Sequence, residues 1–384
     1  MRVGLVIRQF NPQRGGAERW TCELAERAIA AGYEVHVVAQ SFGPAARALP
    51  VVPHVVPRTH SPYAFATAID ETLRELDLDL VHDMGFGWNF DILQPHFGAA
   101  RAQFDRKLLS MPPWKRTVRR VAQSLSLRAH QSERLHWRQY ADHRRWVIAV
   151  SKLVARDLER TLGWPMERTR LIYNGVDLQR FAPANRELHR DAVRKRLKIR
   201  PEELLVLFVA HNATLKGLPT LIRAVGQLRQ ANKPVRLVTI GGDDARKYAR
   251  AARDQGAEDA IACLGAIEDT APFYAAADVF ALPTWYDSCS LVVLEALASG
   301  VPVITSSHNG ASELLTEGRD GFVIDDPGDW QQLAAHLTTL LDPTTRQQMG
   351  MAARHLAERQ PVEANYRQVM ALWQQIAGRM RRAA

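Results

Sequence analysis

Hydrophobic positions along the chain fall into short, nearly unbroken apolar runs that are separated by longer segments of mixed character. A short run without polar interruptions is typical of a strand in a parallel sheet that helices cover on both faces. Segments between the runs have helix length, such as 17–31, which Gly32 ends. This alternation predicts parallel βαβ units and therefore an α/β fold. The runs that we interpret as strands are 3–8, 33–39, 80–82, 147–151, 204–210, 235–240 and 301–305.

The length of 384 residues suggests two domains, each large enough to bury a core. The first ten residues, MRVGLVIRQF, are interpreted as a strand and not as a signal peptide, because they lack a long apolar core. No stretch approaches the roughly 20 apolar residues of a membrane span. Cys22, Cys263 and Cys289 have no disulfide or metal-ligand spacing, so we expect a reducing compartment. We expect a soluble or peripheral protein.

Positive charge is concentrated in one segment. The formal net charge is +9, and residues 101–145 hold twelve Lys and Arg against three acids, a difference of nine that equals the whole excess. Apolar and aromatic residues such as Trp114 lie between these cations. The combination predicts an amphipathic element on an anionic membrane. A nucleic-acid surface and a solvated helical hairpin are the alternatives; we favour the membrane and expect no nucleic-acid partner.

The stretch 287–306, DSCSLVVLEALASGVPVITS, carries the candidate chemistry. It predicts a polar loop, a helix that Ser288 or Ser290 caps, a stop at Gly300, and a buried strand. A helix start offers free N–H groups and a partial positive charge to a phosphate. Glu295 has no basic neighbour on its helix, and a ribose would supply the hydroxyl donors that its carboxylate needs. The alternative is a solvent-facing glutamate.

This stretch resembles the acidic-x7-acidic motif of the retaining GT-B glycosyltransferases of family 4, with Asp287 in the first position and Glu295 in the second. The resemblance covers most of the chain and implies two Rossmann-like domains with a cleft between them. Asn174-Gly175 lies in a segment similar to the interdomain signature of the family. The expected ranges are an N-terminal domain of 1–175 with the basic insertion 101–145, a nucleotide-sugar domain of 176–360, and a helix of 361–384 that returns to the first domain.

The resemblance also assigns residues to the donor site. Asp287 would orient the transferred sugar, Glu295 the ribose, and Lys216 the diphosphate. The family has an arginine six residues before that lysine, whereas this chain has Ala210, so His211, Asn212 or Arg14 would have to compensate. The remaining donor-binding residues implied by the resemblance are Gly15 and Gly16 at the diphosphate, Ile267 at the base, and the helix start Ser288, Cys289, Ser290 and Leu291.

Two further features concern the reaction centre. His96 follows a strand in the part of the first domain where related enzymes place a histidine, so it is a candidate catalytic residue beside Asp287 and Lys216. Asp77-Leu78-Asp79 imitates a metal-binding D-x-D, but it lies where a helix runs into a strand, and we interpret it as turn acids. No metal and no cofactor are expected. The loop 241–244 is expected at the crevice edge of the sheet.

The sequence therefore predicts a retaining hexosyltransferase with a UDP-hexose donor, glucose being favoured, and a lipid-linked glycan acceptor. Within the family the chain looks most like bacterial lipopolysaccharide core glucosyltransferases. The expected location is cytoplasmic, peripheral on the inner face of the bacterial cytoplasmic membrane. Two alternatives remain: a nucleotide-sugar epimerase, which shares the GT-B fold, and a non-catalytic module that binds acidic polymers.

Overall fold

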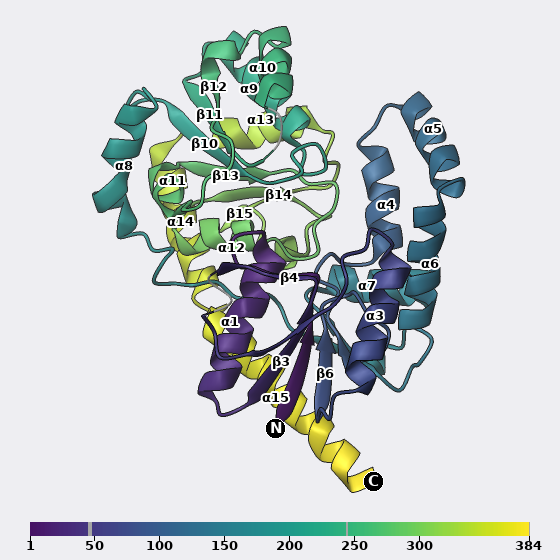
Figure 1. Ribbon diagram of the computed structural model, residues 1–384. Coiled ribbons are helices and arrows are strands. Elements are labelled where there is room, and N and C mark those ends of the chain that lie inside the picture. The colour runs from purple at the N-terminus through teal and green to yellow at the C-terminus, as the bar shows by residue number, and fades with distance from the viewer. Residues whose placement is uncertain (45–47, 243–244, 384) are drawn as a thin grey trace. The chain divides into compact units, whose positions relative to one another are not determined.

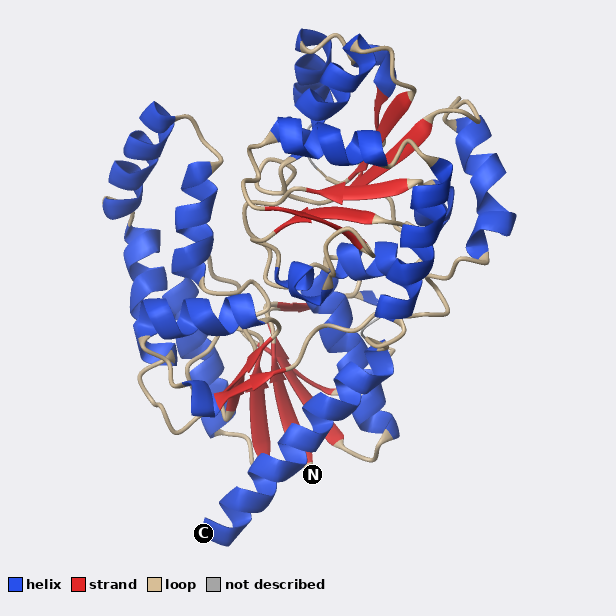
Figure 2. Ribbon diagram, turned by 180° about the vertical axis from the view of Figure 1, so that it is seen from behind, coloured by secondary structure: helices blue, strands red, loops and turns tan. Residues whose placement is uncertain are grey.

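The computed structural model describes residues 1–44, 48–242 and 245–383, and the chain divides into two compact units. The first unit comprises Met1–Phe104, Met111–Ile172 and Ala364–Ala384, and the second comprises Asp105–Ser110 and Tyr173–Glu363. Figure 2 shows that each unit contains strands between layers of helices. The units are described separately below.

The first unit is built on a parallel sheet, which among the described residues has seven strands in the order β5-β3-β1-β6-β7-β8-β9. Apolar strands such as β1, with buried Val3, Leu5 and Val6, need helices on both faces, which explains their continuous hydrophobic pattern. The strands are β1 (Arg2–Val6), β3 (Glu34–Ala39), β5 (Val52–Val55), β6 (Leu80–Asp83), β7 (Ile92–Leu93), β8 (Trp146–Ala149) and β9 (Thr169–Leu171), with a separate small pair of β2 (Gln9–Phe10) and β4 (Ser41–Phe42). The helices are α1 (Gly16–Ala30), α3 (Pro62–Arg74), α4 (Ala100–Leu109), α5 (Pro113–Ser124), α6 (Leu127–Gln139), α7 (Lys152–Leu162) and most of α15 (Val362–Ala383), with a short 3-10 turn at Met166–Arg168.

The second unit has the same design. Within its described residues, six parallel strands run in the order β12-β11-β10-β13-β14-β15. Figure 1 shows them as one layer, with α9 and α13 on one side and α11, α12 and α14 on the other. The strands are β10 (Leu204–Val209), β11 (Val235–Ile240), β12 (Ile261–Cys263), β13 (Val279–Leu282), β14 (Val303–Ser306) and β15 (Gly321–Ile324). The helices are α8 (Asn185–Arg196), α9 (Leu218–Gln230), α10 (Ala245–Asp254), α11 (Ala271–Ala276), α12 (Leu291–Ala298), α13 (Trp330–Thr339) and α14 (Pro343–Ala357), with 3-10 turns at Glu258–Ala260 and Gly310–Leu314.

The C-terminal helix α15 packs within the first unit from Ala364 onwards. Its expected apolar face is buried, and polar contacts supplement it: Trp20 Nε1 donates to Asn365 Oδ1 at 2.8 Å, and the Tyr366 hydroxyl donates to Glu23 Oε2 at 2.7 Å. The face consists of Tyr366, Val369, Leu372, Trp373 and Ile376. Burial of these large side chains explains why a helix at the end of the chain is well ordered.

The two parallel sheets confirm the predicted α/β fold of two Rossmann-like domains. Some boundaries differ from the prediction: the first unit ends at Ile172 and α15 joins it from Ala364, and the short segment Asp105–Ser110 groups with the second unit. The basic segment 101–145 forms the helices α4, α5 and α6. Within the described residues, no helix combines the length and the apolar character needed to cross a membrane.

Candidate functional site

The candidate donor site lies where the strand order of the second unit changes direction. The chain runs from β10 outwards to β11 and β12, then returns to β13 on the other side of β10. Ligands of open parallel sheets bind outside the carboxyl ends of the strands at such a switch point. The loop after β10 carries Lys216, and the loop after β13 carries Asp287, so the topology alone brings these two residues to one place.

Lys216 and Asp287 form an ion pair. The Nζ of Lys216 lies 2.5 Å from Oδ2 of Asp287 and donates to the Tyr286 carbonyl at 3.1 Å. The side chains are 20% and 15% exposed, so the pair is largely shielded from solvent but open on one side. Lys216, which we expect to bind the diphosphate, therefore contacts Asp287, which we expect to bind the sugar.

Close backbone packing fixes these two loops. Gly217 adopts a left-handed conformation with φ of 83°, and a Cβ there would lie 1.9 Å from the Pro283 carbonyl oxygen. Only glycine fits this position. The N–H of Trp285 donates to the Leu215 carbonyl at 2.9 Å, which ties the loops together. Lys216 is thus held at the end of β13 by the residues on either side of it.

The helix α12 begins where the sequence predicted, with Ser290 at the N-cap position. The Ser290 side chain makes no cap hydrogen bond, so the predicted cap is wrong for Ser290. Asn309, fully buried after β14, instead binds the backbone of this N-cap residue: its Oδ1 accepts from the N–H groups of Ser290 at 3.2 Å and of Ala311 at 3.1 Å. Ser288 and Cys289 are buried and Leu291 is half-buried in the same turn. The first amides of α12 beyond Ser290 have no intrahelical carbonyl to bond, which suits an anion.

Glu295 lies inside α12 and is 4% exposed, which rules out a solvent-facing side chain. The carboxylate has a partner on another helix, although its own helix offers no basic neighbour. The Tyr274 hydroxyl, from α11, donates to Glu295 Oε2 at 3.0 Å. Its neighbours on the helix, Val293, Leu294 and Ala296, are buried and apolar. A buried carboxylate needs several hydroxyl or N–H donors, and a ribose would add two hydroxyl groups to the contacts that the protein provides.

The other residues of this unit that we considered for donor binding lie in the loops after β10 and β12. Ile267 is half-buried in the loop after β12. Ala210 is half-buried at the end of β10, where Gly241 approaches so closely that a Cβ would lie 1.7 Å from the Ala210 carbonyl oxygen. His211 and Asn212 are exposed beside it and can reach a ligand from the same loop. Of the predicted crevice loop 241–244, the residues 243 and 244 lie outside the described part of the chain.

The first unit holds the remaining predicted residues. Gly15 is the N-cap residue of α1 and Gly16 its first residue; Gly15 is extended, with φ of −178°, a conformation open to any residue. A Cβ at Gly15 would lie 2.8 Å from Glu18 Oε2, so the Glu18 carboxylate lies beside the helix start. Arg14, considered above as a replacement for the missing arginine, is exposed in the same loop. These amides follow β1 at the carboxyl edge of the sheet, as a phosphate site requires.

Two histidines lie near this edge and differ in character. His82 is fully buried in β6, where Trp373 Nε1 donates to its Nδ1 at 3.2 Å, and burial lowers its pKa to about 3. His96 is half-buried in the loop after β7 and stacks edge-on to Trp20 at 4.7 Å between ring centroids. Burial lowers the pKa of His96 to about 4, so its imidazole is neutral near pH 7 and can donate or accept. Because His96 lies half-buried in a loop and His82 is fully buried in a strand, His96 remains the candidate catalytic histidine.

The D-x-D string behaves as turn acids. Asp79 Oδ2 accepts from the N–H of Arg2 at 2.7 Å, and Asp77 forms an ion pair with the Arg2 side chain. Both acids therefore bind the first residue of β1. Within the described residues, no group of three or more His, Cys, Asp or Glu side chains is placed to hold a metal ion.

Sequence reasoning missed Asn309, Tyr274 and Asn174. Asn174 Nδ2 donates to the Cys289 carbonyl at 2.7 Å and so braces the loop before α12. Asn309 could have been found, because His308-Asn309-Gly310 directly follows a strand and Asn-Gly marks a turn at the crevice edge. Tyr274 had no local signal, since it lies 21 residues from Glu295 on another helix.

Family models match both halves of the chain. The family described as Glycosyltransferase Family 4 matches residues 14–180, and the family described as Glycosyl transferases group 1 matches residues 189–356. D-inositol 3-phosphate glycosyltransferase 2 of Catenulispora acidiphila is 27% identical over 84% of this chain and 82% of that protein. A D-inositol 3-phosphate glycosyltransferase of Xylanimonas cellulosilytica is 31% identical over 56% of this chain, which spans about half (52%) of that relative.

Solved structures show the same architecture. WaaG, a glycosyltransferase involved in lipopolysaccharide biosynthesis, superposes with a TM-score of 0.80 at 21% identity, covering 98% of this chain and all (100%) of that chain. HepE of Anabaena, in complex with UDP and glucose, superposes with a TM-score of 0.70 at 19% identity, covering 96% of this chain and 98% of that chain. At these identities the likeness concerns the fold.

The two parallel-sheet domains, together with the family matches of the two halves of the chain, identify a GT-B glycosyltransferase. The chain belongs to these enzymes, whose two domains are the family 4 and group 1 domains matched above, and which take their sugar from a nucleotide-sugar donor. The expected relation to lipopolysaccharide core glucosyltransferases stays a prediction, because the sequence relatives named above carry another acceptor in their names.

Proposed function

We propose that the protein transfers a hexose, with glucose favoured, from a UDP-sugar to a lipid-linked glycan such as the lipopolysaccharide core, with retention of anomeric configuration. The observation that carries the donor assignment is the meeting of Lys216, Asp287 and the start of α12 at one switch point. HepE, which shares the fold, has been solved with UDP-glucose, and this supports a UDP-hexose as donor.

Each residue has a defined task in this reaction. Lys216 and the first amides of α12 hold the diphosphate and stabilise the negative charge that grows as the bond between the sugar C1 and the phosphate oxygen breaks. Asp287 orients the sugar. The acceptor oxygen forms the new bond to C1 on the same face, and its proton passes to the departing phosphate oxygen. Glu295 accepts from the ribose hydroxyls.

Donor binding must rearrange the Lys216–Asp287 pair. The lysine has its Nζ on Asp287 and on the Tyr286 carbonyl, so an arriving diphosphate competes with both. Once the lysine turns to the phosphates, the Asp287 carboxylate is released for the sugar hydroxyls. The pair therefore keeps both groups in place and neutralised before the donor binds.

The donor assignment is tested by comparing Glu295→Ala with Tyr274→Phe. Glu295→Ala removes the proposed ribose contact and should weaken UDP binding by roughly 1.5–3 kcal/mol, the value of a hydrogen bond to a charged group. Tyr274→Phe is the matched control, because it removes the hydroxyl that donates to Glu295 but keeps the carboxylate. Calorimetry that finds unchanged UDP affinity in Glu295→Ala would refute the ribose contact.

The acceptor side rests on the basic segment. In α5, among the described residues, no side chain is buried. Three large apolar residues of α5 and its C-cap residue follow one another at helical spacing: Trp114, Val118, Val121 and Leu125, which are 66%, 62%, 53% and 78% exposed. A soluble helix normally buries such a face. Lys115, Arg119 and Arg120 are exposed beside it. This arrangement suits the headgroup region of an anionic bilayer, and we therefore place the enzyme on the cytoplasmic face of the bacterial inner membrane.

Vesicle co-sedimentation tests this placement. Changing Lys115, Arg119 and Arg120 to Glu should abolish pelleting with anionic vesicles, since each basic residue near such a surface contributes about 1 kcal/mol. The control changes three exposed cations of the second unit, Lys195, Arg196 and Lys233, and alters the net charge equally. Equal pelleting on neutral and anionic vesicles, or equal loss in both variants, would contradict membrane docking through α5.

The two alternative functions have their own outcomes. An epimerase would convert the sugar of UDP-hexose with no acceptor present, whereas a transferase would leave labelled donor unchanged apart from slow hydrolysis. A binding module for acidic polymers would not bind UDP. Calorimetry and a labelled-donor assay therefore separate the three functions.

A further inference from the structure

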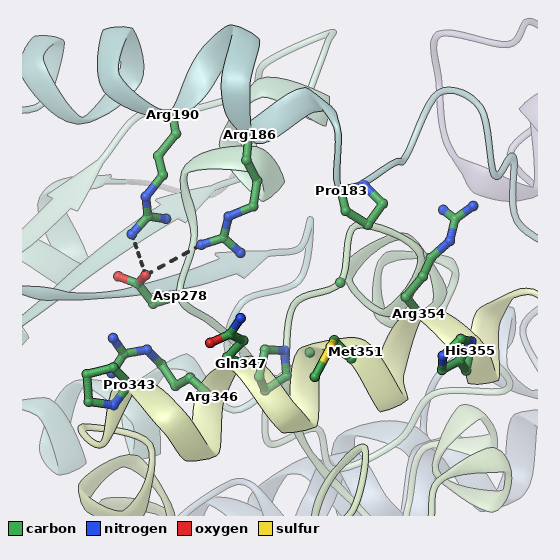
Figure 3. Close-up of a pocket in the computed structure, with 13 residues that line it drawn as sticks. Pro183, Arg186, Arg190, Asp278, Pro343, Arg346, Gln347, Met351, Arg354 and His355 are labelled. Atoms are coloured by element: carbon green, nitrogen blue, oxygen red, sulfur yellow. Dashed lines mark hydrogen bonds and ion pairs between the residues drawn. The ribbon is translucent and has the colours of Figure 1, made fainter.

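A second cavity lies in the same unit, at the opposite edge of its sheet. Asp278 and Pro302, which line it, directly precede β13 and β14, whereas Asp287 and Lys216 follow the carboxyl ends of their strands. The cavity has a volume of about 530 Å³, within the range of small-molecule sites. Figure 3 shows it between α8, which carries Arg186 and Arg190, and α14.

The lining of this cavity is strongly cationic. Arg186 and Arg190 come from α8, and Arg346 and Arg354 from α14. Among the described lining residues, Asp278 is the one acid. Its carboxylate is already engaged by Arg190 at 2.6 Å, Arg194 at 2.9 Å and the Leu205 N–H at 2.8 Å. Asp278 therefore cannot also neutralise the remaining arginines.

Two of these guanidinium groups keep unused donors. The guanidinium of Arg186 approaches Asp278 only to 3.8 Å, and it makes no hydrogen bond to any residue that the structure describes. Arg346 donates through Nη1 to the carbonyls of Leu340 and Leu341 at 2.7 and 2.8 Å, and over the same described residues its Nε and Nη2 make no hydrogen bond. Burial and then the charge of Arg190 lower the pKa of Arg186, whereas the Asp278 carboxylate acts in the opposite direction.

Arg190 and Arg354 differ from these two arginines in that they bond to the protein on several sides. Arg190 donates to the Ala276 carbonyl at 2.9 Å besides its ion pair, and Arg354 donates to the carbonyl of Ala298 at 2.8 Å and pairs with Glu358 at 2.9 Å. These two side chains hold the walls of the cavity together. A ligand would therefore meet Arg186 and Arg346 first.

Apolar side chains form part of the remaining wall. Three prolines and the exposed Met351 side chain line the cavity, together with the polar residues Gln347 and His355. At its base, a Cβ on Gly350 would lie 2.5 Å from the Gly300 carbonyl oxygen, so the backbones of two segments are in direct contact. Such packing leaves little room for collapse. The prolines are Pro183, Pro302 and Pro343.

We propose that this cavity binds a phosphorylated small molecule, with the phosphate on Arg186 and Arg346 and the organic part against the prolines and Met351. A phosphate dianion matches two guanidinium groups that line the same cavity, because a planar guanidinium fork can bind phosphate in a bidentate manner. An apolar wall beside a charged end selects an organic phosphate over the inorganic ion. The site is distinct from the donor crevice, and it does not depend on the function proposed above.

Calorimetry with phenyl phosphate tests the proposal, with UDP present at saturation to occupy the donor crevice. Arg186→Gln should weaken binding at least tenfold, about 1.4 kcal/mol. It should lower the melting temperature little, because among the described residues it removes one long ion pair, of 3.8 Å to Asp278, and no hydrogen bond. Arg346→Gln should weaken binding similarly. The matched control, Arg196→Gln, removes one exposed guanidinium from the same helix and should bind phenyl phosphate as the native chain does.

Several results would overturn the proposal. Failure of the native chain to bind millimolar phenyl phosphate would remove the site, and equal affinity in the Arg186→Gln variant would remove its arginine recognition. Inorganic phosphate should bind several-fold more weakly, and equal affinity would refute the contact with the apolar wall. If UDP itself fails to bind, the donor assignment falls, but the arginine variants still report on this cavity.

Discussion

Asp287→Asn should move nucleotide binding and sugar transfer in opposite directions. Before the donor binds, Lys216 Nζ lies 2.5 Å from Asp287 Oδ2, and the diphosphate must draw the lysine away. Asparagine has nearly the same size but no charge, so it releases Lys216 for the phosphates. The sugar loses its carboxylate contact at the same time. UDP should therefore bind more tightly to the variant, while transfer should collapse.

The expected change in UDP affinity follows from how exposed the Lys216–Asp287 ion pair is. Exposed ion pairs contribute about 0–1 kcal/mol, and breaking a fully buried pair costs about 3–5 kcal/mol. Side chains that are 20% and 15% exposed belong between these limits, at about 1–2 kcal/mol. UDP affinity should accordingly rise by about 5- to 30-fold. Transfer should fall by about 100-fold or more, as when an electrostatic contact to the transition state is removed.

Calorimetry with UDP and a labelled-donor assay with UDP-glucose measure the two effects. Lys216→Gln is the paired control and should weaken UDP binding, because it removes a cation from the diphosphate. If Asp287→Asn lowers UDP affinity in proportion to turnover, Asp287 holds the nucleotide and the division of roles between the two acids is wrong.

Two further predictions concern stability and the helix start. Asn309→Ala should destabilise the second unit by about 1–3 kcal/mol, because the buried N–H groups of Ser290 and Ala311 lose their acceptor. The affinity for UDP should fall together with the stability. If urea unfolding gives the variant the same free energy of unfolding as the native chain, this account of Asn309 is wrong. For His82, whose pKa falls from 6.5 to about 3 on folding, the unfolded chain binds more protons below pH 6.5, so stability should fall as the pH drops. Its contribution at pH 5 is a loss of about 2 kcal/mol, and His82→Gln should remove this part of the pH dependence in urea titrations at pH 5 and 7. The pKa of Asp83 is raised to about 6, so its protonation in the folded chain adds stability as the pH falls. This effect is present in both the native chain and the His82→Gln variant, so it cancels when their pH dependences are compared. An unchanged difference between the two pH values in His82→Gln would exclude His82 as the cause.

Local patterns in the sequence were sufficient for the architecture. Continuous apolar runs such as 204–210 can only be strands buried on both faces, and each is followed by a helix-length segment, so a parallel sheet is the one arrangement that satisfies them. The loop-helix-strand order of 287–306 was also readable, since Gly300 ends the helix and an apolar strand follows. These features depend on neighbours within a few residues.

The sequence by itself thus determined the two α/β domains, the start of α12 and the concentration of charge in residues 101–145. Tertiary structure alone decided which groups meet: Lys216 lies 71 residues from Asp287, and the Glu295 carboxylate finds its hydroxyl on Tyr274 of another helix. It also decided that Asn309 binds the backbone at the start of α12, and that arginines of α8 and α14 share one cavity. Hydrophobic periodicity reports which face of an element is buried, but hydrogen bonds and ion pairs are short-ranged and depend on how loops of different strands converge.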